Sequence, residues 1–190
     1  MAGREKALAA SRRSIRSSAN AIRAIHRGEL DQAETLMGEA RDAILAGRDA
    51  VREEHPEVYF AGFLQDAQKE YAEARLTRAL VTGTDLPGPD DLGVELAPYL
   101  NGMAESIGEG RRAVLDLMRR GRIEESERIL GAMEEMYYLL VSMDFPDAVT
   151  MNLRRTTDVS RSLLERTRGD LTVAAVQRDL QEALERRAET

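Results

Sequence analysis

The apolar residues of this chain recur at intervals of three and four, which is the spacing of one face of an α-helix. Between residues 33 and 51 they form a continuous stripe, made up of Ala33, Met37, Ala40, Ile44, Gly47 and Val51. No segment alternates between apolar and polar residues convincingly enough to indicate a half-buried strand. We therefore predict an all-α protein.

Glycine and proline mark the places where these helices should end. Gly28 and Gly121 each separate two periodic segments, and residues 82–93 hold three glycines and two prolines. We expect turns at residues 144–147 and a helix end at Gly169. The pattern predicts about seven helices, over residues 3–27, 30–54, 57–81, 95–120, 123–143, 148–167 and 171–188. With no internal repeat or linker, residues 1–190 form one helical domain.

The composition narrows the class of protein. Aromatic residues make up only 4% of the chain, so aliphatic side chains must fill the core. Cysteine is absent, which excludes disulfides, thiolate metal sites and a cysteine nucleophile. No apolar run reaches the roughly 18 residues that a membrane span requires. We expect a cytoplasmic protein that does not enter a membrane.

The charge is unevenly distributed, with a basic start and an acidic remainder. The chain carries −7 overall, yet its first 28 residues hold seven basic residues and one acidic residue. If residues 3–27 form one helix, four arginines fall within an arc of about 60°. They are Arg12, Arg16, Arg23 and Arg27. Arginine suits bidentate contact with phosphate, so this stripe predicts binding to a nucleic-acid backbone. The alternative is a surface network of ion pairs with acidic neighbours.

Acidic residues share one face of the predicted helix over 57–81. Asp66, Glu70 and Glu73 lie within an arc of about 60° at 3.6 residues per turn. Carboxylate oxygens are the ligands that Mg²⁺ and Mn²⁺ prefer, and such an ion can activate water and stabilise charge on a phosphate. Because the chain has 34 acidic residues, the same pattern is also typical of a solvated helix face.

Five segments of the sequence are informative together: AIHR at 24–27, FLQDAQKEYAEA at 63–74, YLNGMAESIGE at 99–109, MEEMY at 133–137, and DFPDA at 144–148 followed by LRR at 153–155. Taken together and in this order, they resemble the translin and translin-associated factor X family, and most closely its archaeal and factor-X-like members. The resemblance implies a seven-helix fold and assembly into hollow oligomers, often octamers. It also implies binding of RNA or single-stranded DNA and, in factor-X-like members, Mg²⁺-dependent ribonuclease activity.

The same resemblance implies roles for individual carboxylates. Glu70 and Glu73 match two catalytic glutamates of factor X, and Asp66 is a further candidate metal ligand beside them. Glu109 matches an acidic position of the family and is a candidate catalytic residue and ligand. Glu105 lies one turn before Glu109 on the same helix face.

Two other positions bear on the site. Factor X has a further catalytic aspartate after the tyrosine that matches Tyr137, but this chain has Tyr138 there. Either Glu134 or Glu109 is a candidate to replace that aspartate, and otherwise the site is impaired. His26 is expected to cap or pack near a helix end, with a ligand or general base as the alternative.

Three functions remain open at this point. The first is an endoribonuclease that uses Mg²⁺ or Mn²⁺, acts on single-stranded or processed RNA and forms a homo-oligomer. The second is a non-catalytic oligomer that binds single-stranded RNA or DNA. The third, a helical nucleotide pyrophosphohydrolase, would need a second Glu–x–x–Asp pair on the next helix. Glu105 and Glu109 are instead four residues apart, so this function ranks last.

Overall fold

The helices of the chain are seen in a computed structural model, which describes residues 2–51, 56–143 and 145–188. These residues form nine helical segments and no strand, so the prediction of an all-α protein is confirmed. The segments are α1 (Ala2–Arg27), α2 (Leu30–Asp49), α3 (Pro56–Tyr59), α4 (Phe63–Thr82), α5 (Pro89–Leu92), α6 (Leu96–Met118), α7 (Ile123–Ser142), α8 (Asp147–Thr150) and α9 (Leu153–Ala188).

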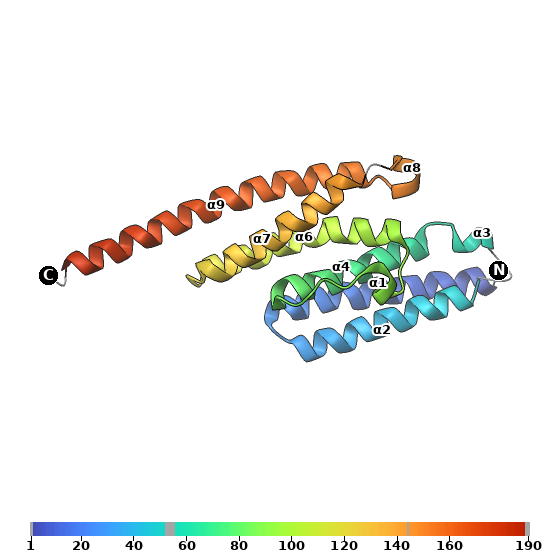
Figure 1. Cartoon of the computed structure of the whole chain (residues 1–190). Helices are drawn as coiled ribbons and strands as arrows, with labels where there is room; N and C mark the ends of the chain where they lie inside the picture. The colour runs from blue at the N-terminus through green and yellow to red at the C-terminus, as the bar shows by residue number, and fades with distance from the viewer. Residues whose placement is uncertain (1, 52–55, 144, 189–190) are drawn as a thin grey trace.

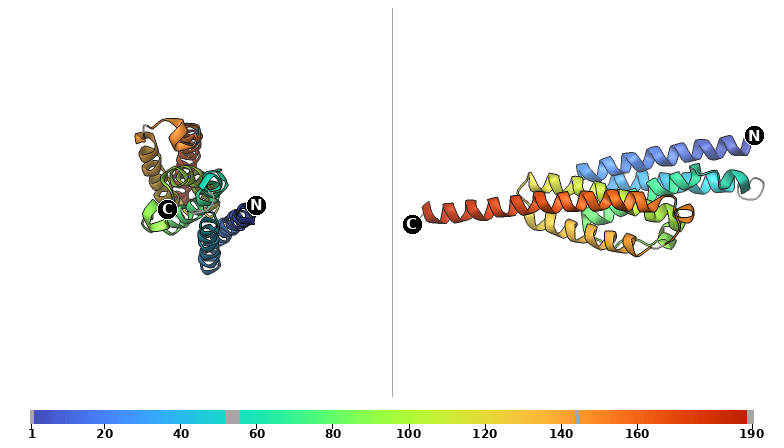
Figure 2. Two further views of the ribbon diagram at one scale, coloured as in Figure 1. Left: turned by 90° about the vertical axis from the view of Figure 1, so that its right-hand side faces the viewer. Right: turned by 90° about the horizontal axis from the view of Figure 1, so that it is seen from above.

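The long helices are arranged in three pairs (Figure 1). α1 and α2 form a hairpin on one side, α4 and α6 lie in the middle, and α7 and α9 lie on the other side (Figure 2). α1 packs on both α2 and α4, while α6 packs on α4, α7 and α9. The α4–α6 pair is therefore the centre of the bundle, and its facing side chains are shielded from both sides.

Three of the predicted helices are divided or joined in the structure. The helix expected over 57–81 is divided into α3 and α4, because Gly62 has a φ of 95°, in the left-handed region that interrupts an α-helix. The helices expected over 148–167 and 171–188 are one helix, α9, preceded by the single turn α8. Glycine inside a helix costs about 1 kcal/mol relative to alanine, which the buried contacts of Leu164 and Leu171 on either side of Gly169 offset.

The ends of other elements also differ in detail. Residues 82–93, expected to be non-helical, contain the single turn α5. The helix expected over 30–54 ends at Asp49, and Ala50 and Val51 form a turn. Residues 52–54 of that prediction and Asp144 of the expected turn lie outside the described residues. The bounds of α1, α6 and α7 agree with the prediction to within two residues.

The core is aliphatic, as the low aromatic content predicts. Its largest fully buried side chains include Met37, Leu76, Leu100, Ile107 and Met133. Alanines alternate with them along the facing helices, and short side chains of this kind let the helices lie close together. Within the described ranges, no helix is both long enough and apolar enough to cross a bilayer.

Close packing of α4 on α6 depends on Gly102. A Cβ atom at this position would lie 2.6 Å from the backbone carbonyl oxygen of Lys69, which is too short for any contact. A Cβ at Gly110 would lie 2.9 Å from the sulfur of Met133, whereas one at Gly108 would meet only an ordinary contact of 3.7 Å. Glycine is thus required at 102 for the approach of the two helices that carry the candidate carboxylates.

Candidate metal centre between α4 and α6

Three carboxylates meet where α4 faces α6. Glu70 and Glu73 come from α4 and Glu105 comes from α6, and one oxygen of each lies within 4.8 Å of the others. Glu105 is one turn beyond Gly102, so the close approach at that glycine brings its carboxylate to the two glutamates of α4. An all-oxygen group of this size suits a hard divalent cation such as Mg²⁺ or Mn²⁺.

Glu73 is the most deeply buried member of the cluster. Glu73 is only 9% exposed, and its carboxylate has no hydrogen bond or ion pair with any of the described residues. Burial, together with the negative charges of Glu70, Glu105 and Glu109, raises the pKa of Glu73 to about 8. A buried carboxylate without a partner is unfavourable unless it binds a proton or a cation.

Lys69 partly compensates the other two carboxylates. Its Nζ lies 2.8 Å from an oxygen of Glu105 and 3.4 Å from an oxygen of Glu70. Burial acts to lower the pKa of Lys69, but the bond to Glu105 and the two nearby charges outweigh it, so the pKa is raised. Burial raises the pKa of Glu70 against the opposing charge of Lys69. The lysine therefore supplies a positive charge beside Glu70 and Glu105, and none of its ion pairs reaches Glu73.

Two predicted ligands do not belong to this cluster. Asp66 is exposed, one turn before Glu70 on α4. Glu109 is engaged elsewhere: its Oε2 lies 2.5 Å from Nε2 of His26 and 3.8 Å from Nη1 of Arg112. The hydrogen bond from His26 lowers the pKa of Glu109 in spite of its burial. The third carboxylate beside Glu70 and Glu73 is accordingly Glu105.

Sequence reasoning missed Glu105 and Lys69 as members of the site. The sequence pattern places Glu105 only beside Glu109, and no sequence feature points to Lys69. The signal that could have found Glu105 is Gly102, because glycine is typical of positions where another backbone approaches closely. A residue one turn from such a contact faces the opposite helix, and Glu105 meets that condition.

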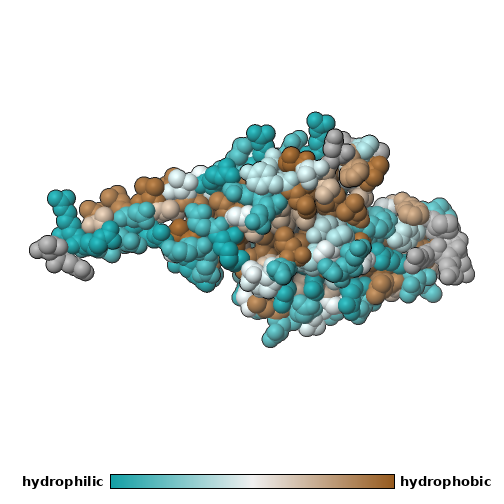
Figure 3. Space-filling view, in the orientation of Figure 1, coloured by the Kyte–Doolittle hydropathy of each residue, from teal (hydrophilic) through white to brown (hydrophobic). Residues whose placement is uncertain are grey.

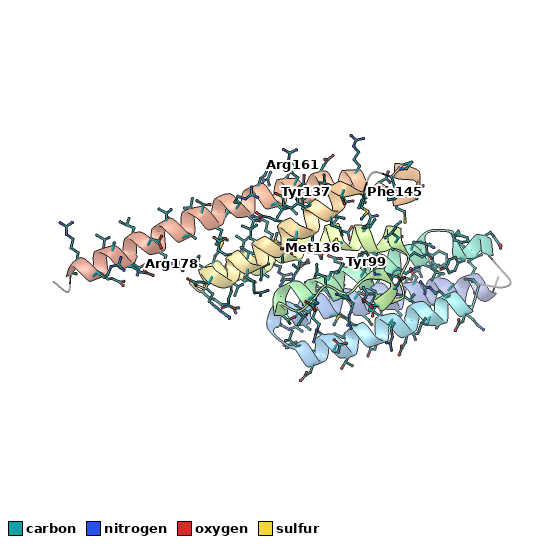
Figure 4. The ribbon with its side chains drawn as sticks, in the orientation of Figure 1. Tyr99, Met136, Tyr137, Phe145, Arg161 and Arg178 are labelled. Carbon is teal, nitrogen blue, oxygen red and sulfur yellow. The ribbon has the colours of Figure 1, made fainter. Side chains whose placement is uncertain are left out.

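Glu134, one of the two candidates to replace the family's aspartate, lies on another face of the bundle, as does Tyr138 itself. Tyr138 is 65% exposed on α7. Oε1 of Glu134 accepts a hydrogen bond of 2.6 Å from Nη2 of Arg168 on α9. These residues line a small hollow between α7 and α9 together with Tyr137 and Arg161, which are labelled in Figure 4. Glu134 therefore takes no part in the cluster between α4 and α6.

The four arginines predicted to form a stripe all lie on α1, and all are exposed. Arg12 and Arg16 have no hydrogen bond or ion pair within the described part of the chain. Arg23 donates to Asn20 at 2.7 Å, and Arg27 donates to Glu29 at 2.6 Å. Pairing with an acidic neighbour thus applies to Arg27 alone among the four, and Arg12 and Arg16 are left without a partner among the described residues.

The arginine stripe adjoins the side on which α1 contacts α6. His26, which bonds Glu109 of α6, lies three residues after Arg23 and hence about 60° from it around the helix. The charge of Glu109 in turn acts on Glu73. His26 therefore connects the end of α1 that carries Arg23 and Arg27 to Glu109, whose charge acts on the carboxylate cluster.

Comparison with known proteins gives a consistent result. No family model matches the chain. An uncharacterized protein of Methanocaldococcus jannaschii is 33% identical over 185 residues, which cover 96% of this chain and 81% of that protein. The crystal structure of AfC3PO is 35% identical with a TM-score of 0.85, covering 93% of this chain and 92% of that one.

Two further structures extend the comparison. AfC3PO in complex with duplex RNA is 32% identical with a TM-score of 0.81, over 93% of this chain and 91% of that one. NeC3PO in its apo form has a TM-score of 0.81 over 90% of this chain and 89% of that one, but at 19% identity it shows the fold alone. Together with the five sequence segments, these matches show that the chain belongs to the C3PO and translin family, as a translin-like protein of the archaeal type.

Proposed function

We propose that the chain is the subunit of a homo-oligomer that binds RNA and cleaves its phosphodiester bonds with the help of Mg²⁺ or Mn²⁺. The observation that carries this proposal is Glu73, a buried carboxylate with no protein partner between two further carboxylates. A divalent cation at this position would remove the repulsion among the three groups.

Glu70, Glu73 and Glu105 are the residues that would hold the ion. A bound ion of this kind supplies a Lewis acid for phosphate oxygens and a nucleophile from water at neutral pH. Lys69 balances part of the negative charge beside Glu70 and Glu105. The arginines of α1 would hold the backbone of the RNA next to the carboxylates through charge-assisted contacts with phosphate.

The choice of RNA is supported by two independent features. AfC3PO, which is 32% identical in that comparison, has been solved with duplex RNA. In this chain Arg12 and Arg16 are exposed and unpaired among the described residues, as phosphate-binding groups should be. Contacts to phosphate carry little sequence information, so we expect binding to both single-stranded and duplex RNA.

Cleavage tests the catalytic part of the proposal. Labelled single-stranded and duplex RNA would be incubated with the protein in Mg²⁺, Mn²⁺ or EDTA. We expect cleavage in either metal and none in EDTA, and we expect Glu73→Gln and Glu105→Gln to slow it at least about 100-fold because each removes a charge that holds the ion. Asp66→Asn, on the exposed part of α4, is the matched control and should cleave normally. Undiminished cleavage by Glu73→Gln would show that the site lies elsewhere.

A second function is favoured by one residue. Tyr138 occupies the position where factor X has a catalytic aspartate, and it lies exposed on α7, away from the cluster. The alternative is therefore a non-catalytic oligomer that binds single-stranded RNA or DNA. It predicts no turnover in any divalent metal and binding that still requires Arg12 and Arg16.

A further inference from the structure

Glu109 lies one helical turn beyond Glu105 on α6, at the edge of the carboxylate cluster. It is near enough for its negative charge to act on Glu73, yet it is not one of the three groups whose oxygens converge. Both of its described contacts, to His26 and to Arg112, involve the same oxygen, Oε2. Oε1 of Glu109 has no hydrogen bond or ion pair with a described residue, and the side chain is 25% exposed.

His26 comes from the last turn of α1, a different helix from the two that carry the cluster. Its side chain is only 5% exposed, and its Nε2 lies 2.5 Å from Glu109, whose side chain is 25% exposed. A buried imidazole is normally oriented by its hydrogen bonds. In this pair the rigid histidine side chain fixes the carboxylate of Glu109, because the glutamate has the longer and more flexible side chain.

We propose that Glu109 is an outer carboxylate of the metal centre and that His26 is its positioning residue. In this arrangement Glu70, Glu73 and Glu105 hold the ion directly. Oε1 of Glu109 accepts hydrogen bonds from the water molecules around the ion. The inference rests on the proposed metal centre and assigns to Glu109 and His26 roles that differ from direct ligation.

The chemistry of the expected ions favours such a group. Mg²⁺ gives up its water reluctantly, keeps several water molecules and is usually bound through only a few carboxylates. Residues that contact the ligands or the bound water affect metal affinity almost as strongly as ligands do, typically by about 10–100-fold. A carboxylate that is fixed from a neighbouring helix and has one oxygen free fits this role.

The competing explanation is a purely structural tie between α1 and α6. Such a tie would change the thermal stability of the protein when it is broken but would leave the affinity for metal unchanged. The two explanations therefore differ in what they predict for metal binding by the folded protein in the absence of RNA.

The test is calorimetric titration of the intact, metal-free oligomer with MnCl₂. We expect His26→Ala and Glu109→Gln each to weaken Mn²⁺ binding by about 10–100-fold. His26→Gln retains an N–H that can donate to Glu109 and should stay within about threefold of the wild type. Glu34→Gln is the matched control, because it breaks an inter-helix ion pair of 2.7 Å with Arg75, away from the cluster, and should bind Mn²⁺ normally. Melting curves without metal would show that each variant is folded.

The outcomes separate this inference from the proposed function. If the wild type binds Mn²⁺ and Glu73→Gln does not, but His26→Ala and Glu109→Gln bind normally, the metal centre stands and the role of the pair is overturned. Equal weakening by His26→Ala and His26→Gln also overturns the positioning role, since the hydrogen bond would then not matter. A wild-type protein that binds no Mn²⁺ overturns both the metal centre and the inference.

Discussion

At the scale of single residues, the site is defined by which carboxylates have protein partners. Glu109 has His26, Glu105 has Lys69, and Glu73 has neither a hydrogen bond nor an ion pair among the described residues. The differences in pKa follow from this, because a hydrogen bond lowers the pKa of Glu109 while burial raises that of Glu73. Because Glu73 is buried beside other negative charges, its carboxylate must bind either a proton or a cation.

Glu73 should make the metal-free protein less stable as the pH rises. The folded state holds its proton up to a pH of about 8, whereas the unfolded state releases it near the ordinary pKa of 4.5. Between these values the unfolded state binds fewer protons than the folded state, so raising the pH favours unfolding. The free energy of unfolding falls by at most about 1.4 kcal/mol for each unit of pKa shift. Glu73→Gln mimics the protonated side chain and should lose this dependence.

Urea denaturation without divalent metal at pH 5 and pH 8 measures the effect. The variant should be more stable than the wild type at pH 8 and similar to it at pH 5. Asp66→Asn, which neutralises an exposed carboxylate on the same helix, should show a much smaller difference between the two pH values. If Glu73→Gln stabilised the protein equally at pH 5 and pH 8, a raised pKa of Glu73 would be ruled out as the cause.

At the scale of helices, the approach of α4 to α6 decides which carboxylates can share an ion. The approach depends on Gly102, whose missing side chain leaves room for the backbone of α4 at Lys69. α1 then adds two features from one helix, the exposed arginines on one face and His26 towards α6. The site is thus assembled from three helices: α4 and α6 supply the carboxylates, and α1 supplies His26 and the arginines.

Gly102→Ala should push the two helices apart. The added Cβ would meet backbone rather than a flexible side chain, so we expect a loss of stability of about 1–3 kcal/mol together with weaker binding of Mn²⁺. Gly108→Ala is the control in the same helix, because its Cβ would meet only a contact of 3.7 Å and alanine favours helix. Thermal melting and Mn²⁺ titration of both variants make the comparison. If the two variants had equal stability and equal affinity for Mn²⁺, the close approach of the helices at Gly102 would not be what positions the carboxylates.

The arginines of α1 should contribute to RNA affinity through charge. Arg12→Ala with Arg16→Ala should weaken binding at low salt and reduce the slope of log K against log salt concentration by about 1–2, since each phosphate contact contributes just under one unit. Fluorescence anisotropy with labelled RNA at several salt concentrations gives this slope. Arg186→Ala with Arg187→Ala, at the far end of α9, is the charge-matched control. An unchanged slope in the α1 variant would exclude the stripe as the phosphate contact.

At the scale of the whole molecule, the protruding part of α9 is the most conspicuous feature. α9 lies along α7 as far as Arg178, which donates to Glu124 at 2.5 Å, and then extends beyond the bundle (Figures 1 and 4). Apolar side chains lie exposed along the C-terminal half of α9, both before and after Arg178 (Figure 3). They are Val173, Val176, Leu180 and Leu184. Their spacing of three and four places them on one face, which supports the proposed self-association.

Charge introduced on this face should reduce the size of the assembly. We expect Val176→Glu with Leu180→Glu to lower the molar mass measured by light scattering after size exclusion, because each glutamate would have to be buried without a partner. Gln177→Glu with Gln181→Glu changes exposed polar positions of the same helix segment and is the control. An unaltered mass for the first variant would place the contact between subunits elsewhere.

The sequence by itself determined the helical class and the groups that share one helix face. Periodicity places Arg12, Arg16, Arg23 and Arg27 together on α1, and it places Glu70 and Glu73 together on α4, because both relations are set by the geometry of a single helix. The predominance of aliphatic side chains in the core also follows from residue type. These predictions depend only on neighbours within a few residues.

The tertiary structure decided how groups from different helices combine. Glu105 joins Glu70 and Glu73 whereas Glu109 turns to His26, although both lie on the same face of α6. The crossing of α4 over α6 and the position of the end of α1 determine this choice, and no local pattern records either. Likewise α9 continues through Gly169, because packing of its buried residues outweighs the small helix cost of a glycine.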